Sequence, residues 1–171
     1  MTRYCALLRA VNVGGTGKLP MADLRALCTQ AGFTQVSTYI ASGNALFTAH
    51  GDEPTIRAAL ETRLAAYAGK PVGVLLRSAS EMAAALRANP WPDARPNQIG
   101  VLFLPDAPES DALAPRGLST EEIIPLGRTV FIHYPDGIGR SKLKLAAMEQ
   151  GTTRNLNTVA KLVDLLGGPT D

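Results

Sequence analysis

Two cysteines, two histidines and one tryptophan occur among the 171 residues, and aromatic residues make up only 5% of the chain. Cys5 lies in a strand-like run and Cys28 in a helix-like one, so a disulfide scaffold is excluded and a reduced, cytoplasmic protein is expected. No CxxC motif occurs, and His50 and His133 have no partners at ligand spacing. The sequence therefore predicts no metal site and no cofactor.

Long hydrophobic runs and a strong net charge are also missing. No segment approaches the roughly 18 apolar residues that a membrane span needs, and the start, MTRYCALLRAV, lacks a small-residue cleavage site and is typical of a first strand. We therefore expect no membrane partner. The formal net charge is +2, which is too small to indicate nucleic-acid binding by itself.

The composition that remains is that of a globular protein, with 46% hydrophobic and 19% charged residues. The charge is unevenly distributed. Residues 140–161 contain five cationic side chains and one acid, Glu149, whereas residues 106–122 contain five acids and one cation, Arg116. Each segment is either a solvated face or part of a binding surface.

The first half of the chain has the order of elements of a ferredoxin-like unit. Four apolar segments have the length and composition of strands, namely residues 3–11, 36–41, 45–48 and 71–77. Apolar residues at helical spacing predict one helix between Pro20 and Gly32 and another between Pro54 and Gly69. The resulting order is β-α-β-β-α-β.

The second half partly repeats this order, although no literal sequence repeat is visible. Helices are predicted near residues 80–88, 141–149 and 154–166, and strands at 99–104, 121–124 and 129–134. We therefore predict an α+β fold with two ferredoxin-like (βαββαβ-type) subdomains in one compact chain. The first subdomain spans residues 1–78 and the second spans residues 79–171, whose C-terminal helices pack back.

A glycine-rich loop follows the first strand, in the segment Arg9-Ala-Val-Asn-Val-Gly-Gly-Thr-Gly-Lys18. Such a loop at the start of a helix can direct several backbone N–H groups at an anion, with two cations beside it. The segment is not a P-loop, because Asn12 stands where that motif needs glycine and Leu19 where it needs serine or threonine. A tight turn that merely requires glycine is the alternative.

Two later segments are also candidates for binding an anion. In Gly137-Ile-Gly-Arg-Ser-Lys-Leu-Lys144, Ser141 is predicted to cap a helix whose first turn carries cations, an arrangement that a bound anion would offset. In Thr152-Thr-Arg-Asn-Leu-Asn-Thr158, Thr153 is predicted to cap a helix rich in donors suited to carboxylate or phosphate. A solvated basic turn and a structural capping network are the respective alternatives.

Four blocks of sequence in this order resemble the bacterial family called domain of unknown function 1697. They are LLRAVNVGGTGKLPMADLRAL, FTQVSTYIASGNALF, GRSKLK and TTRNLNTVAKL. The chain departs from the family's usual pattern at Ala10, Leu156 and Ala160. The resemblance implies two related α+β subdomains with the C-terminal helix packed back, and it implies no established activity.

The first hypothesis is a protein, enzyme or not, that binds an anionic small molecule or nucleotide in a polar cleft between the subdomains. Its candidate ligand-binding residues are Arg9, Asn12, Gly14, Gly15, Lys18, Ser42, Asn44, Arg140, Ser141, Lys142, Arg154, Asn155, Asn157 and Thr158. No nucleophile–base pair is visible, so no catalytic residue is predicted. A nucleic-acid-binding protein and a non-catalytic interaction protein are the alternatives, and the oligomeric state is not readable from the sequence.

Overall fold

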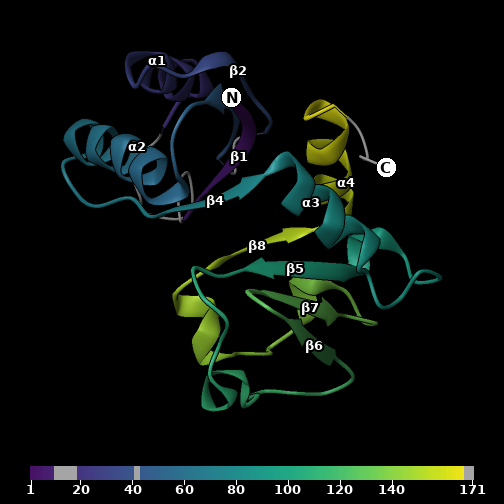
Figure 1. Ribbon diagram of the computed structural model, residues 1–171. Helices are drawn as coiled ribbons and strands as arrows, with labels where there is room; N and C mark the ends of the chain where they lie inside the picture. Colours follow the sequence, from purple (N-terminus) through teal and green to yellow (C-terminus); the bar gives the residue numbers. More distant parts are fainter. Residues whose placement is uncertain (10–18, 41–42, 168–171) are drawn as a thin grey trace. The chain divides into compact units, whose positions relative to one another are not determined.

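A computed structural model describes residues 1–9, 19–40 and 43–167 of the chain (Figure 1). The chain divides into two compact units, one of Met1–Met82 together with the chain from Leu162 onward, and one of Ala83–Lys161. Each unit contains one antiparallel sheet of four strands. The predicted α+β class with two ferredoxin-like halves is confirmed. None of the helices in the described part of the chain is both long and apolar enough to span a membrane.

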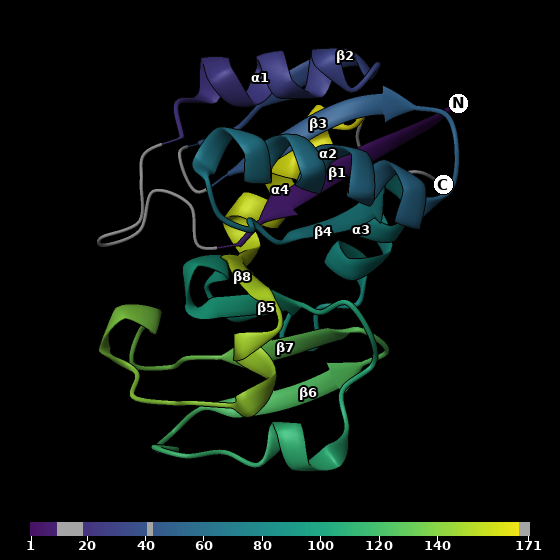
Figure 2. The same ribbon diagram turned by 90° about the vertical axis from the view of Figure 1, so that its left-hand side faces the viewer.

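The sheet of the first unit has the order β2-β3-β1-β4, with every neighbouring pair antiparallel. Its elements are β1 (Thr2–Leu8), α1 (Met21–Gln30), β2 (Thr34–Thr38), β3 (Asn44–Ala49), α2 (Glu53–Ala68) and β4 (Val74–Ser78). The two helices are the crossover connections, and both cover the same face of the sheet (Figure 2). This is the ferredoxin-like arrangement that the sequence predicts for residues 3–77.

Local sequence signals explain where α2 begins and ends. The Asp52 side chain accepts a hydrogen bond of 2.9 Å from the Thr55 N–H at the start of α2, and Pro54 occupies the first turn. Gly69 ends the helix with a φ of +72°, a left-handed conformation that glycine adopts without steric cost. The buried residues Leu60 and Leu64 then face the sheet.

The connection between β2 and β3 contains a strained residue. Ile40 has a φ of +51° and is 45% exposed, and Gly43 has a φ of +88°. A β-branched residue in the left-handed region crowds its own backbone, which costs roughly 1–2 kcal/mol. The turn therefore forms despite Ile40, because β2 and β3 are held together on either side of it.

Replacing Ile40 with asparagine should stabilise the protein by about 1 kcal/mol, since asparagine tolerates the left-handed conformation. Chemical denaturation of the wild type and Ile40→Asn measures the change, and Ile40→Val serves as a control that keeps the β-branch and should bring no gain. A loss of stability in Ile40→Asn would show that the covered part of the Ile40 side chain contributes more than the relief of strain.

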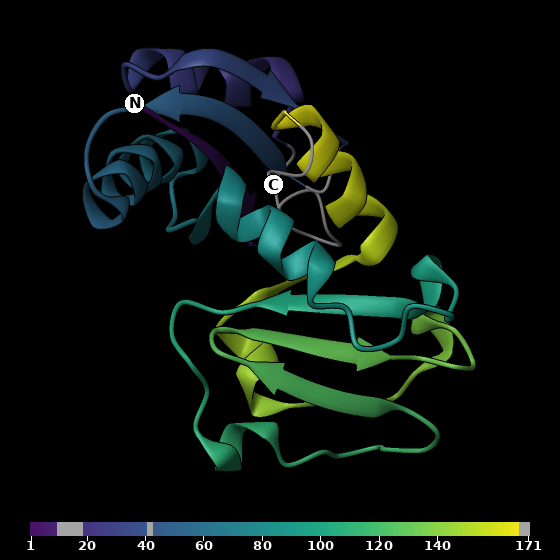
Figure 3. The ribbon, with the colours of Figure 1, turned by 45° about the vertical axis from the view of Figure 1, so that its right-hand side comes forward.

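The sheet of the second unit has the equivalent order, β6-β7-β5-β8 (Figure 3). Its strands are β5 (Ile99–Phe103), β6 (Glu122–Leu126), β7 (Thr129–His133) and β8 (Thr152–Asn155). Short 3-10 helices stand in the crossover connections: η2 (Ser110–Leu113) before β6, and η3 (Ile138–Arg140) and η4 (Ala146–Glu149) before β8. A further 3-10 helix, η1 (Pro96–Gln98), precedes β5, and α3 (Ala79–Arg87) and α4 (Leu156–Leu165) follow β4 and β8.

The helix predicted over residues 141–149 does not form, except for the single 3-10 turn of η4. The chain runs in extended conformation through Ser141, and Lys144 forms an antiparallel bridge with Arg116. Leu143 and Leu145 are buried whereas Lys142 and Lys144 are exposed. This alternation has the period of two that an extended segment requires, and it outweighs the helical propensity of lysine and leucine.

The helix predicted over residues 154–166 begins two residues later than expected. Thr152–Asn155 form β8 instead, which pairs with β5. The helix is capped by Asn155 and not by Thr153, because the Asn155 side-chain oxygen accepts a hydrogen bond of 2.9 Å from the Thr158 N–H. Arg154 therefore lies on a strand and not in the first turn of the helix.

The strand register reveals a repeat that the amino-acid sequence does not show. Arg77 of β4 pairs with Cys5 of β1, and Arg154 of β8 pairs with Val101 of β5. Each arginine thus occupies the same position in its sheet, and the two are only 3% and 7% exposed. The residue after each arginine caps a helix: Ser78 accepts from the Glu81 N–H in front of α3, as Asn155 does for α4.

Candidate functional site

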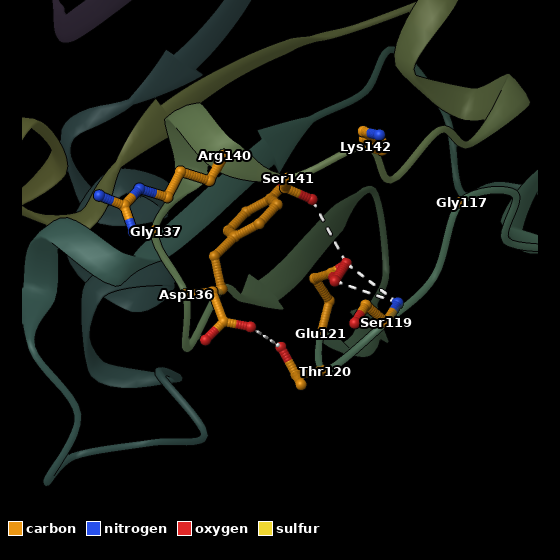
Figure 4. A pocket seen from close by; sticks show the side chains of 10 residues that line it. Gly117, Ser119, Thr120, Glu121, Asp136, Gly137, Arg140, Ser141 and Lys142 are labelled. Atoms are coloured by element: carbon orange, nitrogen blue, oxygen red, sulfur yellow. Dashed lines mark hydrogen bonds between the residues drawn. The ribbon is translucent and has the colours of Figure 1, made fainter.

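A polar pocket of about 240 Å³ lies in the second unit. Two chain segments line it, one leading into β6 and the other following β7 (Figure 4). The lining residues are Gly117, Ser119, Thr120 and Glu121 from the first segment and Tyr134, Asp136, Gly137, Arg140, Ser141 and Lys142 from the second. Three of the predicted site residues, Arg140, Ser141 and Lys142, therefore lie together.

The pocket lies between the two crossover connections of the second sheet, where the first sheet has the long helices α1 and α2. Gly117 allows the two connections to approach each other closely. A Cβ atom on Gly117 would lie 2.2 Å from the Lys142 carbonyl oxygen, and the φ of Gly117 is +70°. No other residue type fits there without moving the backbone. Next to it, Arg116 and Lys144 exchange two backbone hydrogen bonds of 2.9 and 2.8 Å.

Both carboxylates of the pocket accept hydrogen bonds from neighbouring protein groups (Figure 4). The half-buried Glu121 accepts from the Ser119 N–H at 3.2 Å and from the Ser141 hydroxyl at 3.3 Å. The exposed Asp136 accepts from the Thr120 hydroxyl through Oδ2 at 2.7 Å. The bonds from Thr120 to Asp136 and from Ser141 to Glu121 connect the two segments, whereas the bond from Ser119 to Glu121 lies within the first segment.

Tyr134 is the aromatic residue of the pocket lining. Its backbone N–H donates to the Gln98 carbonyl at 2.7 Å, which fixes it at the end of β7. Its ring is 5% exposed and packs over Gly100, where a Cβ atom would lie 3.0 Å from Cε2 of the ring. Burial, and to a smaller extent the negative charge of Glu121, raise the pKa of the Tyr134 phenol. The hydroxyl is therefore protonated at neutral pH.

The raised pKa of Tyr134 predicts a loss of stability in alkaline solution. The unfolded phenol ionises near pH 10, before the folded one does, so the contribution is complete below about pH 10 and is lost as the pH rises through the folded pKa. The melting temperature should fall less steeply above about pH 10 in Tyr134→Phe than in the wild type. Equal slopes in the two proteins would show that the burial of Tyr134 has no influence on its titration.

The two cations of the pocket differ from the carboxylates in their contacts. Arg140 and Lys142 are exposed, and among the described residues neither side chain has an ion pair or hydrogen-bond partner. In Figure 4 Arg140 and Lys142 lie on either side of Ser141. Ser141 caps no helix, and its hydroxyl instead accepts a hydrogen bond of 3.1 Å from the Leu143 N–H while donating to Glu121.

Comparison with known proteins gives the family of the chain. Residues 1–131 match the family described as protein of unknown function (DUF1697). The chain belongs to this family. Among solved structures, it is similar to the conserved bacterial protein SP0830 from Streptococcus pneumoniae, with a TM-score of 0.77 and 28% identity over 96% of this chain and 98% of that one. No curated protein matches.

Two of the four sequence blocks that carry the resemblance to DUF1697 lie within the matched residues, and the blocks GRSKLK and TTRNLNTVAKL lie beyond residue 131. The pocket of this DUF1697 chain is built across that limit, from residues 117–121 and 134–142. No function is attached to the family or to SP0830 by their descriptions. Groups of three or more side chains suited to a metal ion are absent from the described residues.

Arg154 is buried, lies in β8 and is not among the residues that line the pocket. Its Nη1 donates to the Thr152 hydroxyl at 2.6 Å and to the Thr153 carbonyl at 3.2 Å. Asn155 is occupied in capping α4, Thr158 is half-buried in the first turn, and Asn157 is exposed. The contacts of Arg154 and Asn155 favour a structural role, and their predicted role in ligand binding stays a prediction.

Replacing Arg154 with alanine should destabilise the protein by about 2–4 kcal/mol, because buried hydrogen-bonding groups lose a charged partner. Urea denaturation measures the change. Arg140→Ala is the matched control, since it removes an exposed arginine of the same unit and should alter the stability by less than about 0.5 kcal/mol. A similar stability for both variants would contradict the structural role of Arg154.

The remaining predicted site residues belong to the first unit. Arg9 is half-buried, and its side chain lies against Gly73. A Cβ atom added at Gly73 would lie 3.1 Å from Cδ of Arg9. Asn44 is fully buried, and its Nδ2 donates to the Tyr39 carbonyl at 2.9 Å, which closes the turn between β2 and β3. Five other predicted residues lie outside the described part of the chain: Asn12, Gly14, Gly15, Lys18 and Ser42.

Seven lining residues of the pocket were not predicted as site residues: Gly117, Ser119, Thr120, Glu121, Tyr134, Asp136 and Gly137. Two local signals could have indicated them. Ser119-Thr120-Glu121 places two hydroxyls beside a carboxylate, and Asp136-Gly137 is typical of a tight turn after a strand. No local signal shows that these two segments face each other, because their hydrogen-bonded residues are 16 and 20 positions apart in the sequence.

Proposed function

We propose that this DUF1697 protein binds a small anionic molecule in the pocket formed by residues 117–121 and 134–142. The observation that supports this proposal most directly is the difference between the charged groups of the pocket. The carboxylates of Glu121 and Asp136 already accept hydrogen bonds from Ser119, Ser141 and Thr120. Arg140 and Lys142 have no such partner among the described residues.

Hydrogen bonds in which one partner is charged are the strongest that a ligand can form with a protein surface. Arg140 offers five N–H donors in a planar fork, and Lys142 offers three. The carboxylates of the pocket already accept hydrogen bonds from internal donors, whereas the donors of Arg140 and Lys142 have no partner among the described residues. An anionic oxygen, as in a phosphate or a carboxylate, is the partner that satisfies them.

The size of the pocket supports a ligand smaller than a nucleotide. Its volume of about 240 Å³ lies below the 300–1,000 Å³ that is usual for drug-sized ligands. Tyr134 is the only aromatic residue of the lining, and its ring is almost fully buried, so little aromatic surface is available for stacking with a nucleobase. We therefore favour a phosphorylated or carboxylated small molecule over a nucleotide.

The wider hypothesis from the sequence places Arg9, Lys18, Asn44, Arg154 and Asn155 in a cleft between the subdomains. It stays a prediction. The pocket proposed here lies within the second unit, so it depends on Arg140, Ser141 and Lys142 and not on those five residues.

Thermal-shift measurements with phosphate, sulfate, carboxylates, sugar phosphates and nucleotides should identify at least one anion that stabilises the protein. A ligand at 100 times its dissociation constant stabilises by about 2.7 kcal/mol, which the measurement resolves. Arg140→Ala and Lys142→Ala should each weaken the binding of that compound by about tenfold or more, because each removes a charge-assisted hydrogen bond. Titration calorimetry gives the dissociation constants.

Lys144→Ala is the matched control, because Lys144 is exposed, lies two residues from Lys142 and does not line the pocket. It should change the dissociation constant by no more than about twofold at physiological salt, where exposed charges are screened. An equal loss in Lys144→Ala would replace the pocket with a diffuse basic surface. Binding of oligonucleotides only, and only at low salt, would favour the nucleic-acid alternative, and no stabilisation by any compound would favour an interaction protein.

A further inference from the structure

The pocket contains acceptors as well as donors, and this combination restricts the chemistry of its ligand. Two acids and two bases line it, so their formal charges cancel. An anion that binds to Arg140 or Lys142 also meets the field of Glu121 and Asp136. A bare anion therefore gains hydrogen bonds on one side of the pocket and suffers repulsion from the other.

Each carboxylate retains capacity to accept further hydrogen bonds. A carboxylate provides about four lone-pair sites. Asp136 uses Oδ2 for the Thr120 hydroxyl, and none of the hydrogen bonds formed among the described residues involves its Oδ1. Asp136 is exposed, and Thr120 fixes its orientation at the pocket. A donor on the ligand, such as a hydroxyl group, would meet an acceptor that is already positioned.

Resting on the function proposed above, we propose that the ligand is a phosphorylated polyol or sugar of about pentose size, whose phosphate binds to Arg140 and Lys142 and whose hydroxyl groups donate to Asp136 and Glu121. Hydrogen bonds from the hydroxyl groups to the two carboxylates offset the repulsion between these carboxylates and the phosphate. The pocket's volume of about 240 Å³ accommodates such a compound, and its serine and threonine hydroxyls suit a polar ligand without a nucleobase. Asp136 is then the residue that determines specificity.

Titration calorimetry with ribose 5-phosphate, inorganic phosphate and ribose tests this assignment. Ribose 5-phosphate should bind at least tenfold more tightly than inorganic phosphate, and ribose alone should bind more weakly than ribose 5-phosphate. Asp136→Asn should weaken the binding of ribose 5-phosphate by about tenfold, the effect of one charge-assisted hydrogen bond. The same substitution should leave inorganic phosphate binding unchanged or tighten it, because a nearby negative charge is removed.

Two further variants keep the test independent of folding. Glu122→Gln removes an exposed acid next to Glu121 that does not line the pocket, so it should affect both phosphates equally. Thr120→Val removes the hydroxyl that orients Asp136, and it should weaken ribose 5-phosphate selectively even if Asp136→Asn does not fold. The melting temperature of each variant is measured first.

The outcomes separate this inference from the proposed function. If ribose 5-phosphate and inorganic phosphate bind equally tightly, and Asp136→Asn tightens both, anion binding stands and the polyol assignment is wrong. If neither phosphate binds, or if ribose binds as tightly as its phosphate, the anion site itself is wrong and the inference fails with it. Opposite responses of the two phosphates to Asp136→Asn, with equal responses to Glu122→Gln, support the assignment.

Discussion

The hydrogen-bonded register of β5 with its two neighbours determines the architecture of the second unit. β5 is buried along its whole length and pairs antiparallel with β7 on one side and β8 on the other. A shift by one residue would move every side chain of β5 to the opposite face. The register fixes where β7 ends, at the point where Tyr134 donates to Gln98, and therefore where the lining of the pocket begins.

The pocket is a consequence of how the second unit crosses its sheet. The first unit uses the helices α1 and α2, whose apolar residues pack on the sheet. The second unit uses extended chain and 3-10 turns, whose packing on the sheet depends on residues such as Leu143 and Leu145. Thinner connections leave room for polar side chains, and the hydrogen bonds from Thr120 to Asp136 and from Ser141 to Glu121 hold these connections together.

The arginines of the chain illustrate how burial separates structural from functional roles. Arg77 and Arg154 occupy equivalent positions in their two sheets, are almost fully buried and donate to carbonyl groups of their own strands. Arg140 is exposed at a pocket and keeps its donors available to a ligand. The basic segment of residues 140–161 is therefore not one surface, since Arg154 within it faces the interior.

The sequence by itself determined the order of strands and helices in the first half, because apolar spacing, Pro54 and Gly69 are local signals that act on neighbouring residues. It also identified Arg140, Ser141 and Lys142 as candidates, from their charge and hydroxyl chemistry. Only the tertiary structure decided that residues 141–145 are extended, since burial of Leu143 and Leu145 needs a sheet to pack on. Only the tertiary structure brought Glu121 to Ser141 and Asp136 to Thr120. Hydrogen bonds between distant segments depend on strand order and register, which cannot be read from the local sequence of either segment.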